Sequence, residues 1–257
     1  MKKISFLIVA LVITITMAAQ ETSRQYYQLK IYSFENDAQV QATDDYLKNA
    51  FLPALKRMDI KTVGVFKLRA MDSVTPKKTY VLIPFSSLTQ FEGMDSALAA
   101  DKAYLDAGKG YITAAHDKAP FKRIQSILLK AFPDMPVMQA SKLDGPREDR
   151  VYELRSYEGP TEALYRKKVE MFNLGGEIKL FDRLNFNAVF YSEVLSGSQM
   201  PNLMYMTTFA NQEDRDAHWK AFIDSPEWTV LKAMPQYQNT VSRNEQVFLY
   251  PTEYSDY

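Results

Sequence analysis

The chain has 257 residues, of which 46% are hydrophobic and 13% aromatic, so it is long enough to bury two ordinary cores. Its 31 basic residues balance its 31 acidic residues, and this gives no support for nucleic acid or another polyanion as a partner. The sequence contains no cysteine, which excludes disulfides, thiol nucleophiles, thiolate metal sites and lipoprotein acylation.

Residues 1–19 have the composition of a signal peptide. Lys2 and Lys3 form a charged start, residues 4–16 are an apolar run, and Ala18 and Ala19 offer a cleavage site. The apolar run would reach only about 20 Å as a helix, against about 30 Å for the hydrocarbon core of a bilayer, so a membrane anchor is the weaker alternative. We expect an exported protein, periplasmic or secreted, with no membrane span after cleavage.

The second half of the chain repeats the first. Residues 27–32 (YQLKIY) match residues 152–157 (YELRSY) at a spacing of 125, and Phe85 matches Phe209 at a spacing of 124. A repeat of this length is a whole domain rather than a solenoid unit. We therefore expect a first domain at residues 20–133, a linker at 134–148 and a second domain at 149–257.

Hydrophobic alternation and turn residues predict the order strand, helix, strand, strand, helix, strand in the first copy. The expected elements are strand 26–33, helix 43–57, strands 62–68 and 79–85 joined by a hairpin at 71–76, a helix capped by Ser86 or Ser87 and running to about residue 107, and strand 123–132. Pro53 lies inside the first helix, where it should cause a kink.

The second copy follows the same order. It predicts strand 150–157, helix 161–173, a short helix at 177–184 after Gly175-Gly176, strands 186–193 and 203–209, helix 212–234 broken at residues 225–228, and strand 245–250.

This order of elements folds most simply as a ferredoxin-like antiparallel sheet with both helices on one face. Two such sheets can bury their bare faces against each other, so we predict an α+β protein in which two tandem ferredoxin-like units form an intramolecular dimeric α/β barrel. Alternation groups the more apolar residues of the two first strands on one face, which we expect under the helices: Tyr27, Leu29, Ile31, Tyr152 and Leu154. The opposite face is then expected inside the barrel and carries Gln28, Lys30, Tyr32, Glu153, Arg155 and Tyr157.

This polar face is the best candidate for a ligand site. An enclosed face should bury charge only where the charge is paired or useful, and two tyrosines offer flat walls with hydroxyl tips. The residues expected to bind a ligand are Lys30, Tyr32, Glu153, Arg155, Tyr157 and Trp219. The alternative is that Lys30 and Arg155 only form salt bridges across the barrel.

Common catalytic motifs are absent, among them the Gly-x-Ser-x-Gly elbow, His-Glu-x-x-His and the phosphate-binding loop. Of the two histidines, His116 lies in a polar loop and is expected at the surface. His218 lies on a predicted helix one turn after Arg215, so it is a weak catalytic candidate together with Tyr205, as a haem ligand or proton carrier. The plainer alternative is a helix-surface histidine bonded to a carboxylate. We expect no metal and no cofactor, with haem considered only under this enzymatic alternative.

Several segments of the second copy resemble the NIPSNAP family: residues 151–157 (VYELRSY), 200–206 (MPNLMYM), 215–222 (RDAHWKAF) and 225–228 (SPEW). The first copy is similar more loosely, since it keeps residues 51–55 (FLPAL) and 60–66 (IKTVGVF) but has DKAY at 101–104 where the second copy has SPEW. The resemblance implies the dimeric α/β barrel fold. It implies little about activity, because the family has no generally established reaction.

Two functions of different class remain open. The first is an exported barrel protein that binds a small amphipathic or aromatic ligand, or a protein partner, in or at the barrel, with further assembly into a homodimer as an open possibility. The second is a barrel-type monooxygenase or haem-binding enzyme that uses His218, Tyr205 and Arg155.

Overall fold

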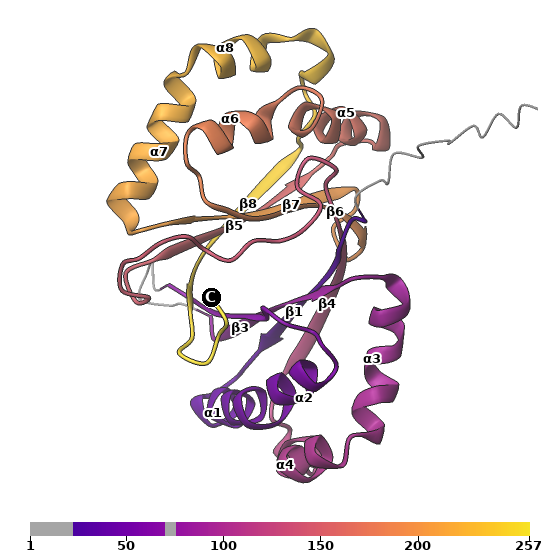
Figure 1. Ribbon diagram of the computed structural model, residues 1–257. Helices are drawn as coiled ribbons and strands as arrows, with labels where there is room; N and C mark the ends of the chain where they lie inside the picture. The colour runs from indigo at the N-terminus through magenta and orange to yellow at the C-terminus, as the bar shows by residue number, and fades with distance from the viewer. Residues whose placement is uncertain (1–22, 70–75) are drawn as a thin grey trace, which may run out of the picture.

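The strands form one closed antiparallel barrel in the computed structural model, which describes residues 23–69 and 76–257 (Figure 1). The expected signal peptide and most of the expected hairpin turn lie outside the described residues. The strands are β1 (Tyr26–Ser33), β2 (Gly64–Leu68), β3 (Lys78–Phe85), β4 (Arg123–Ala131), β5 (Val151–Glu158), β6 (Ala188–Ser196), β7 (Asn202–Phe209) and β8 (Arg243–Pro251). Their order around the barrel is β1-β3-β2-β8-β5-β7-β6-β4. The predicted α+β barrel is confirmed.

Each half of the chain contributes one side of the barrel. The first half supplies β4, β1, β3 and β2, and the second half supplies β8, β5, β7 and β6, in the same relative order. Two antiparallel seams join the halves: Phe66 pairs with Pro251 between β2 and β8, and Lys130 pairs with Glu193 between β4 and β6. The interior of the barrel is therefore built jointly by both copies.

Helices cover the outside of the barrel in two layers, one over each half (Figure 1). The first layer contains α1 (Asp37–Tyr46), a π-helical turn (Leu47–Phe51), α2 (Leu52–Arg57), α3 (Leu88–Ala100) and α4 (Lys102–Ile112). The second contains α5 (Glu162–Phe172), α6 (Glu177–Arg183), α7 (Gln212–Asp224) and α8 (Pro226–Ala233). None of the helices in the described part of the chain is both long and apolar enough to cross a membrane.

The first helix departs from the prediction at its start and at Pro53. It begins earlier because the Asn36 side chain caps it, accepting a hydrogen bond from the Gln39 amide. The expected kink takes the form of a π-helical turn just before Pro53, in which the Leu52 amide donates to the carbonyl of Leu47, five residues back. The wider turn absorbs the loss of the proline donor without ending the helix.

The second helix of the first copy is broken, as its counterpart in the second copy is. Asp101 ends α3 and caps α4 by accepting from the Tyr104 amide, and Ser225 caps α8 by accepting from the Trp228 amide. The two capping residues lie 124 residues apart, at the spacing of the repeat. The single helix expected to run to about residue 107 was therefore wrong, because Asp101 is a cap rather than an interior residue.

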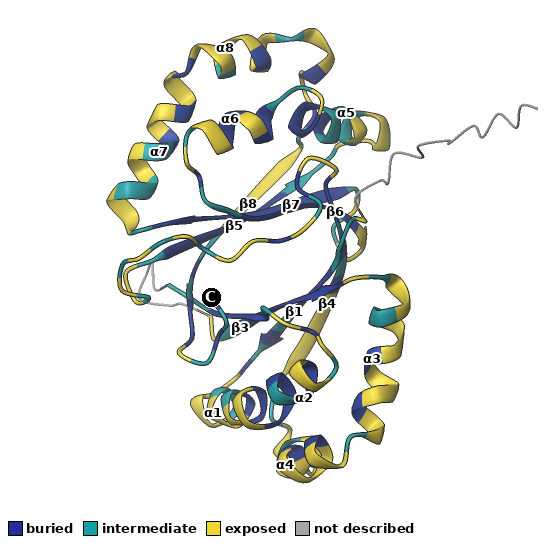
Figure 2. Cartoon of the chain, in the orientation of Figure 1, coloured by how far each residue is buried: buried dark blue, intermediate teal, exposed yellow. Residues whose placement is uncertain are grey.

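The two faces of β1 and β5 are inverted relative to the prediction. The residues expected under the helices point into the barrel instead and join one apolar cluster with the other strands: Tyr27, Leu29, Ile31, Tyr152 and Leu154. The polar face expected inside the barrel lies under the helices: Gln28, Lys30, Tyr32, Glu153, Arg155 and Tyr157. Figure 2 shows most of the sheet as buried, except the starts of β4 and β8, between helices whose outer faces are exposed.

The inversion has a physical cause. Strands surround most of the barrel interior, joined by Met138 of the linker and by Tyr257, and apolar side chains fill it. The helix layer of the second half brings donors and cations such as Arg215, Trp219 and Lys168 within reach of the sheet, so a charged residue can be paired there. Alternation groups residues by face but does not say which face turns inward.

Candidate functional site

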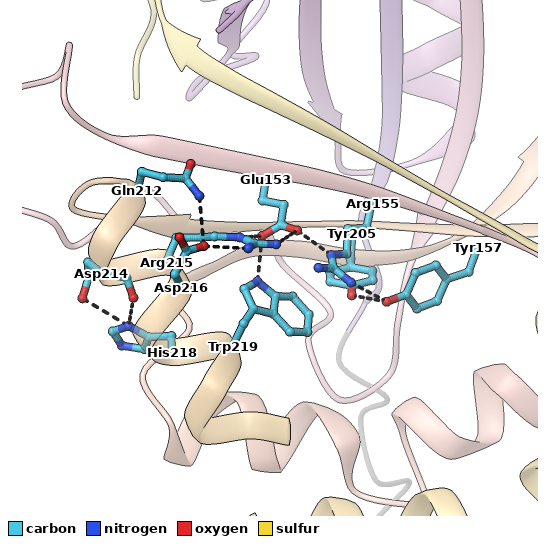
Figure 3. A network of polar contacts seen from close by, with 10 residues as sticks. All are labelled: Glu153, Arg155, Tyr157, Tyr205, Gln212, Asp214, Arg215, Asp216, His218 and Trp219. Atoms are coloured by element: carbon cyan, nitrogen blue, oxygen red, sulfur yellow. Dashed lines mark hydrogen bonds and ion pairs between the residues drawn. The ribbon is translucent and has the colours of Figure 1, made fainter. Parts of the chain in front are cut away.

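Four hydrogen bonds converge on the Glu153 carboxylate beneath α7 (Figure 3). Its Oε1 accepts from Arg155 Nε at 2.6 Å and Arg215 Nη2 at 2.9 Å. Its Oε2 accepts from Arg215 Nε at 2.9 Å and Trp219 Nε1 at 2.7 Å. Arg215 also donates to Asp216 at 2.8 Å, so two guanidinium cations meet two carboxylates. Glu153 is fully buried and its acceptor positions are filled by the protein itself.

This arrangement keeps the central ion pair charged. Burial alone would raise the pKa of Glu153, but the hydrogen bonds from Arg215 and the charges of Arg155 and Arg215 outweigh it and hold that pKa below the ordinary 4.5. Burial would likewise lower the pKa of Arg155, and its neighbours Tyr205, Tyr157 and Glu153 instead raise it above the ordinary value. The Glu153–Arg155 pair is therefore ionised at neutral pH.

The start of α7 positions two of these side chains. The Asn211 side chain caps the helix by accepting from the Asp214 amide, which fixes where its first turn begins. Arg215 and Trp219 are four residues apart and so lie on one face, above β5. The Arg155 guanidinium stacks on the Trp219 ring at 3.6 Å from its centroid, a cation–π contact.

A chain of hydroxyls continues from Arg155 along the sheet. Arg155 Nη1 donates to the Tyr157 hydroxyl at 3.0 Å, and this hydroxyl lies 2.8 Å from that of Tyr205. Tyr205 sits opposite Arg155 in the pairing of β5 with β7. Tyr205 is fully buried, and burial raises its pKa well above 10. Its phenol is therefore a neutral hydrogen-bonding group rather than a base.

A second buried ion pair, which sequence reasoning missed, lies beside this network. Lys168 Nζ on α5 donates to Glu177 Oε2 at 2.8 Å and lies 4.7 Å from the centroid of the Phe172 ring and 5.5 Å from that of Tyr157. Gly176, with φ of 88°, turns the chain between α5 and α6 and so brings Glu177 back toward Lys168. The available signal was the spacing of Lys168 and Phe172, four residues apart on one helix face.

His218 does not join the network. Its Nδ1 lies 2.7 Å from the Asp214 carbonyl and 3.1 Å from the Asp214 carboxylate, and its ring packs 5.8 Å from that of Phe186 and 5.6 Å from that of Phe209. Figure 3 shows it on the opposite side of Trp219 from the two tyrosines. The Asp214 carbonyl and carboxylate hold Nδ1 and two phenylalanines pack near the ring, so contacts outside the Glu153 network position His218. His218 is the carboxylate-bonded helix histidine of the plainer alternative.

The remaining predicted residues lie in the other half. Lys30 and Tyr32 are under the helices of the first half, with Lys30 Nζ 5.2 Å from the centroid of the Phe51 ring. Burial lowers the pKa of Lys30, and Lys30 forms no ion pair with any described residue. His116 is exposed in a 3₁₀ turn at His116–Lys118. The single pocket expected to combine Lys30 and Tyr32 with Glu153, Arg155 and Tyr157 is thus wrong, since these residues lie under two separate helix layers.

Comparison with known proteins identifies the half that holds the Glu153 network. Residues 152–256 match the model of the NIPSNAP family. The second half is a NIPSNAP domain. A NIPSNAP-like domain protein from Burkholderia xenovorans is 18% identical, with a TM-score of 0.37, and the match covers 41% of this chain and 88% of that one. No curated protein matches the chain.

Over nearly its whole length the chain shares its fold with two proposed monooxygenases. The one from Lactobacillus acidophilus NCFM is 11% identical with a TM-score of 0.58, and the match covers 89% of this chain and 94% of that one. The one from Fusobacterium nucleatum subsp. nucleatum is 10% identical with a TM-score of 0.56, covering 90% and 93%. At these identities the likeness shows the dimeric α/β barrel fold alone.

An open pocket of about 770 Å³ adjoins the network of the NIPSNAP domain, between the linker, α6 and the start of β6. Phe181, Phe186 and Tyr191 form its aromatic floor, and Tyr191 stacks on Tyr205 with 5.5 Å between ring centroids. Its polar rim consists of Asp134, Gln139, Lys142, Lys179, Asp182, Asn185 and Asn187. Burial raises the pKa of Tyr191 well above 10, and its hydroxyl makes no hydrogen bond to the described residues.

Proposed function

We propose that the NIPSNAP domain binds a small aromatic or amphipathic molecule in the pocket between the linker, α6 and β6. The observation that carries this proposal is the Tyr191 hydroxyl, which belongs to a buried residue lining the pocket and has no partner within the described residues. This hydroxyl is not sealed from the pocket, so it can donate a hydrogen bond to an acceptor on a ligand. Because its pKa is raised, this phenol stays protonated and acts as the donor.

The rest of the pocket supports the same class of ligand. Phe181 and Phe186 offer apolar ring faces to an aromatic or alkyl group. The rim carries two lysines and two aspartates, a balance that favours a neutral, partly polar molecule over an ion. The Glu153 network lies behind the floor with its hydrogen bonds filled, so its contribution is to hold β5, β7 and α7 in place.

Fluorescence titration with 1-naphthol tests the proposal, because this probe joins an aromatic body to one hydroxyl. Ala140→Trp should fill the pocket from its exposed edge and abolish saturable binding, whereas Ala217→Trp, on the exposed face of α7, should leave binding unchanged. Tyr191→Phe should weaken binding about 2- to 12-fold, the range for one lost hydrogen bond. Equal binding by Ala140→Trp and the parent protein would overturn the proposal.

A barrel-type monooxygenase is the second candidate, supported by the fold shared with the two proposed monooxygenases over nearly the whole chain. The geometry of its three named residues does not support this candidate. Tyr205 and Arg155 are buried and both bond to the Tyr157 hydroxyl, whereas His218 lies apart from both. Oxygen uptake with 1-naphthol and related phenols would support it, particularly if Tyr191→Phe reduced the rate.

Two further parts of the proposal concern location and architecture. We propose export of the mature protein, on the composition of residues 1–19, and expect N-terminal sequencing of the exported fraction to begin near Ala19 or Gln20. An intact Met1 there would contradict it. We also propose that each half is a ferredoxin-like unit, supported by the repeated strand order.

A further inference from the structure

We propose a second binding site at the mouth of the barrel, built by both halves together, that takes a small molecule with an apolar body and a carboxylate. The site is a pocket of about 250 Å³ at one end of the barrel. It shares no lining residue with the pocket of the NIPSNAP domain, so each proposal can be tested independently of the other.

The floor of this pocket is apolar and belongs to the shared interior. Ile31 and Ile127 come from the first half, and Leu154, Met204 and Val247 come from the second. These side chains stand on five strands, β1, β4, β5, β7 and β8, so the floor exists only where the two sheets face each other. A surface of this kind favours an alkyl or aryl group, because burying apolar area is the main driving force available to it.

The Tyr80 hydroxyl provides one polar group in this otherwise apolar part of the pocket. Tyr80 is only 4% exposed and lines the pocket, and its hydroxyl makes no hydrogen bond to any described residue. Burial, with a smaller effect from Glu245, raises the pKa of Tyr80 to about 12, so the phenol stays protonated. A neutral phenol in this position can donate to an anionic oxygen at the end of an apolar ligand.

The charges at the rim favour an anion over a cation. Lys78 is half-buried at the start of β3 and forms no ion pair within the described part of the chain. Arg243, at the start of β8, reaches Glu158 only at 3.8 Å, and Glu245 is the one carboxylate in the lining. Within the lining two cations face one carboxylate, but Glu158, outside the lining, offsets the charge of Arg243, so Lys78 is the cation that favours an anion. Lys78 and the Tyr80 hydroxyl together provide the donors that a carboxylate needs.

Hexanoate is a suitable probe, with 1-hexanol and hexylamine as neutral and cationic controls of the same chain length. Titration of the full-length protein labelled at isoleucine and methionine methyl groups shows where each probe binds. We expect hexanoate to shift the methyl signals of Ile31, Ile127 and Met204, and to bind more tightly than either control.

Two variants test the donors, each with a matched control. Lys78→Gln should weaken hexanoate binding about 10-fold, while Lys77→Gln should not, because Lys77 is exposed and pairs with Asp37 outside the barrel. Tyr80→Phe should weaken it about 3- to 10-fold, while Tyr152→Phe, which removes a hydroxyl of the barrel interior outside this lining, should not. Lys78 is only half-buried, so its replacement keeps the test valid if Tyr80→Phe misfolds.

Three outcomes would overturn the proposal. The first is hexanoate shifting Ile178 and Met135, which line the pocket of the NIPSNAP domain, instead of the barrel residues. The second is hexylamine binding as tightly as hexanoate, since the rim would then select cations through Glu245. The third is an unchanged dissociation constant in both Lys78→Gln and Tyr80→Phe.

Discussion

The helix-covered faces of the two halves have diverged, although the halves share one barrel. At the spacing of the repeat, the network residues Glu153, Arg155, Tyr205, Arg215 and Trp219 correspond to Gln28, Lys30, Val81, Phe91 and Asp95. The cation on the first strand is kept in both copies, but the carboxylate beside it and the arginine above it are not. Lys30 therefore rests on the Phe51 ring with a lowered pKa, whereas Arg155 is paired and hydrogen-bonded.

The difference shows which contacts constrain a duplicated domain. A side chain in the barrel interior packs in one cluster with strands of both halves, and Tyr27 and Leu29 recur there as Tyr152 and Leu154. A side chain under the helices packs mainly against its own half, and only Tyr254 joins the first layer and Phe132 and Met135 the second from outside that half. Residues on that face can change in one copy without disturbing the other, so a buried ion network could arise in one half alone.

Removing the central carboxylate should give the largest effect. Glu153→Gln leaves the guanidinium groups of Arg155 and Arg215 without their shared counter-charge, so we expect a loss of about 3–5 kcal/mol in unfolding free energy by urea titration. Gln28→Leu, at the equivalent position, removes one hydrogen bond to Ser126 and should cost less than about 1.5 kcal/mol. Similar losses in the two variants would mean that the halves do not differ as described.

A cavity in the shared interior should lower the unfolding free energy by a similar amount whichever half the substitution lies in. Leu29→Ala and Leu154→Ala each remove a buried side chain from the same cluster, and each should lower the unfolding free energy by about 2–5 kcal/mol. The measurement is again urea unfolding, with Leu105→Ala on the exposed face of α4 as a control that should change little. A cost confined to one of the two leucines would contradict a common interior.

Removing one hydroxyl from each helix-covered face should give a smaller difference in stability between the two halves. Tyr157→Phe leaves Arg155 Nη1 and the buried Tyr205 hydroxyl without their partner, and we expect a loss of about 1–3 kcal/mol. Tyr32→Phe, 125 residues earlier, removes a hydroxyl that makes no hydrogen bond to the described residues and should be nearly neutral. Thermal unfolding of the two variants side by side checks this. A larger loss for Tyr32→Phe would reverse the comparison.

The sequence predicts the fold where the signals are local. The alternation of residues 26–33 locates β1, and the N-cap residues Asn211 and Thr161 correspond to the starts of α7 and α5. The face of β1 and β5 that points into the barrel was predicted wrongly, because the alternation pattern is the same whichever face turns inward. Which face turns inward depends on the hydrogen-bond and ion-pair partners that the helices offer to the sheet. These partners lie far from the strands in the sequence.

The same limit applies to the candidate site. Glu153, Arg155, Tyr157 and Trp219 were selected from sequence and do lie together, since a buried acid and base on one strand face need a partner. Lys168, Glu177 and Tyr191 were not selected. The Lys168–Glu177 pair depends on the turn at Gly176, and Tyr191 becomes interesting only because the linker leaves a pocket above it.

The smallest effect is the pH dependence that Glu153 adds to stability. Its pKa is lowered in the folded protein, so the folded state holds its proton less tightly than the unfolded chain does. The resulting stabilisation is complete well above the ordinary pKa of 4.5, and it is lost as the pH falls through the lower folded value. Unfolding free energies measured between pH 7 and pH 3 should therefore fall more steeply for the parent protein than for Glu153→Gln, with the curves parallel above about pH 6. Gln28→Leu should retain the steep fall of the parent, because the first half has no carboxylate at this position. If Glu153→Gln and the parent lost stability in parallel over the whole acid range, the Glu153 carboxylate would not be held ionised by Arg155 and Arg215, and the contrast between the two helix faces would rest on packing alone.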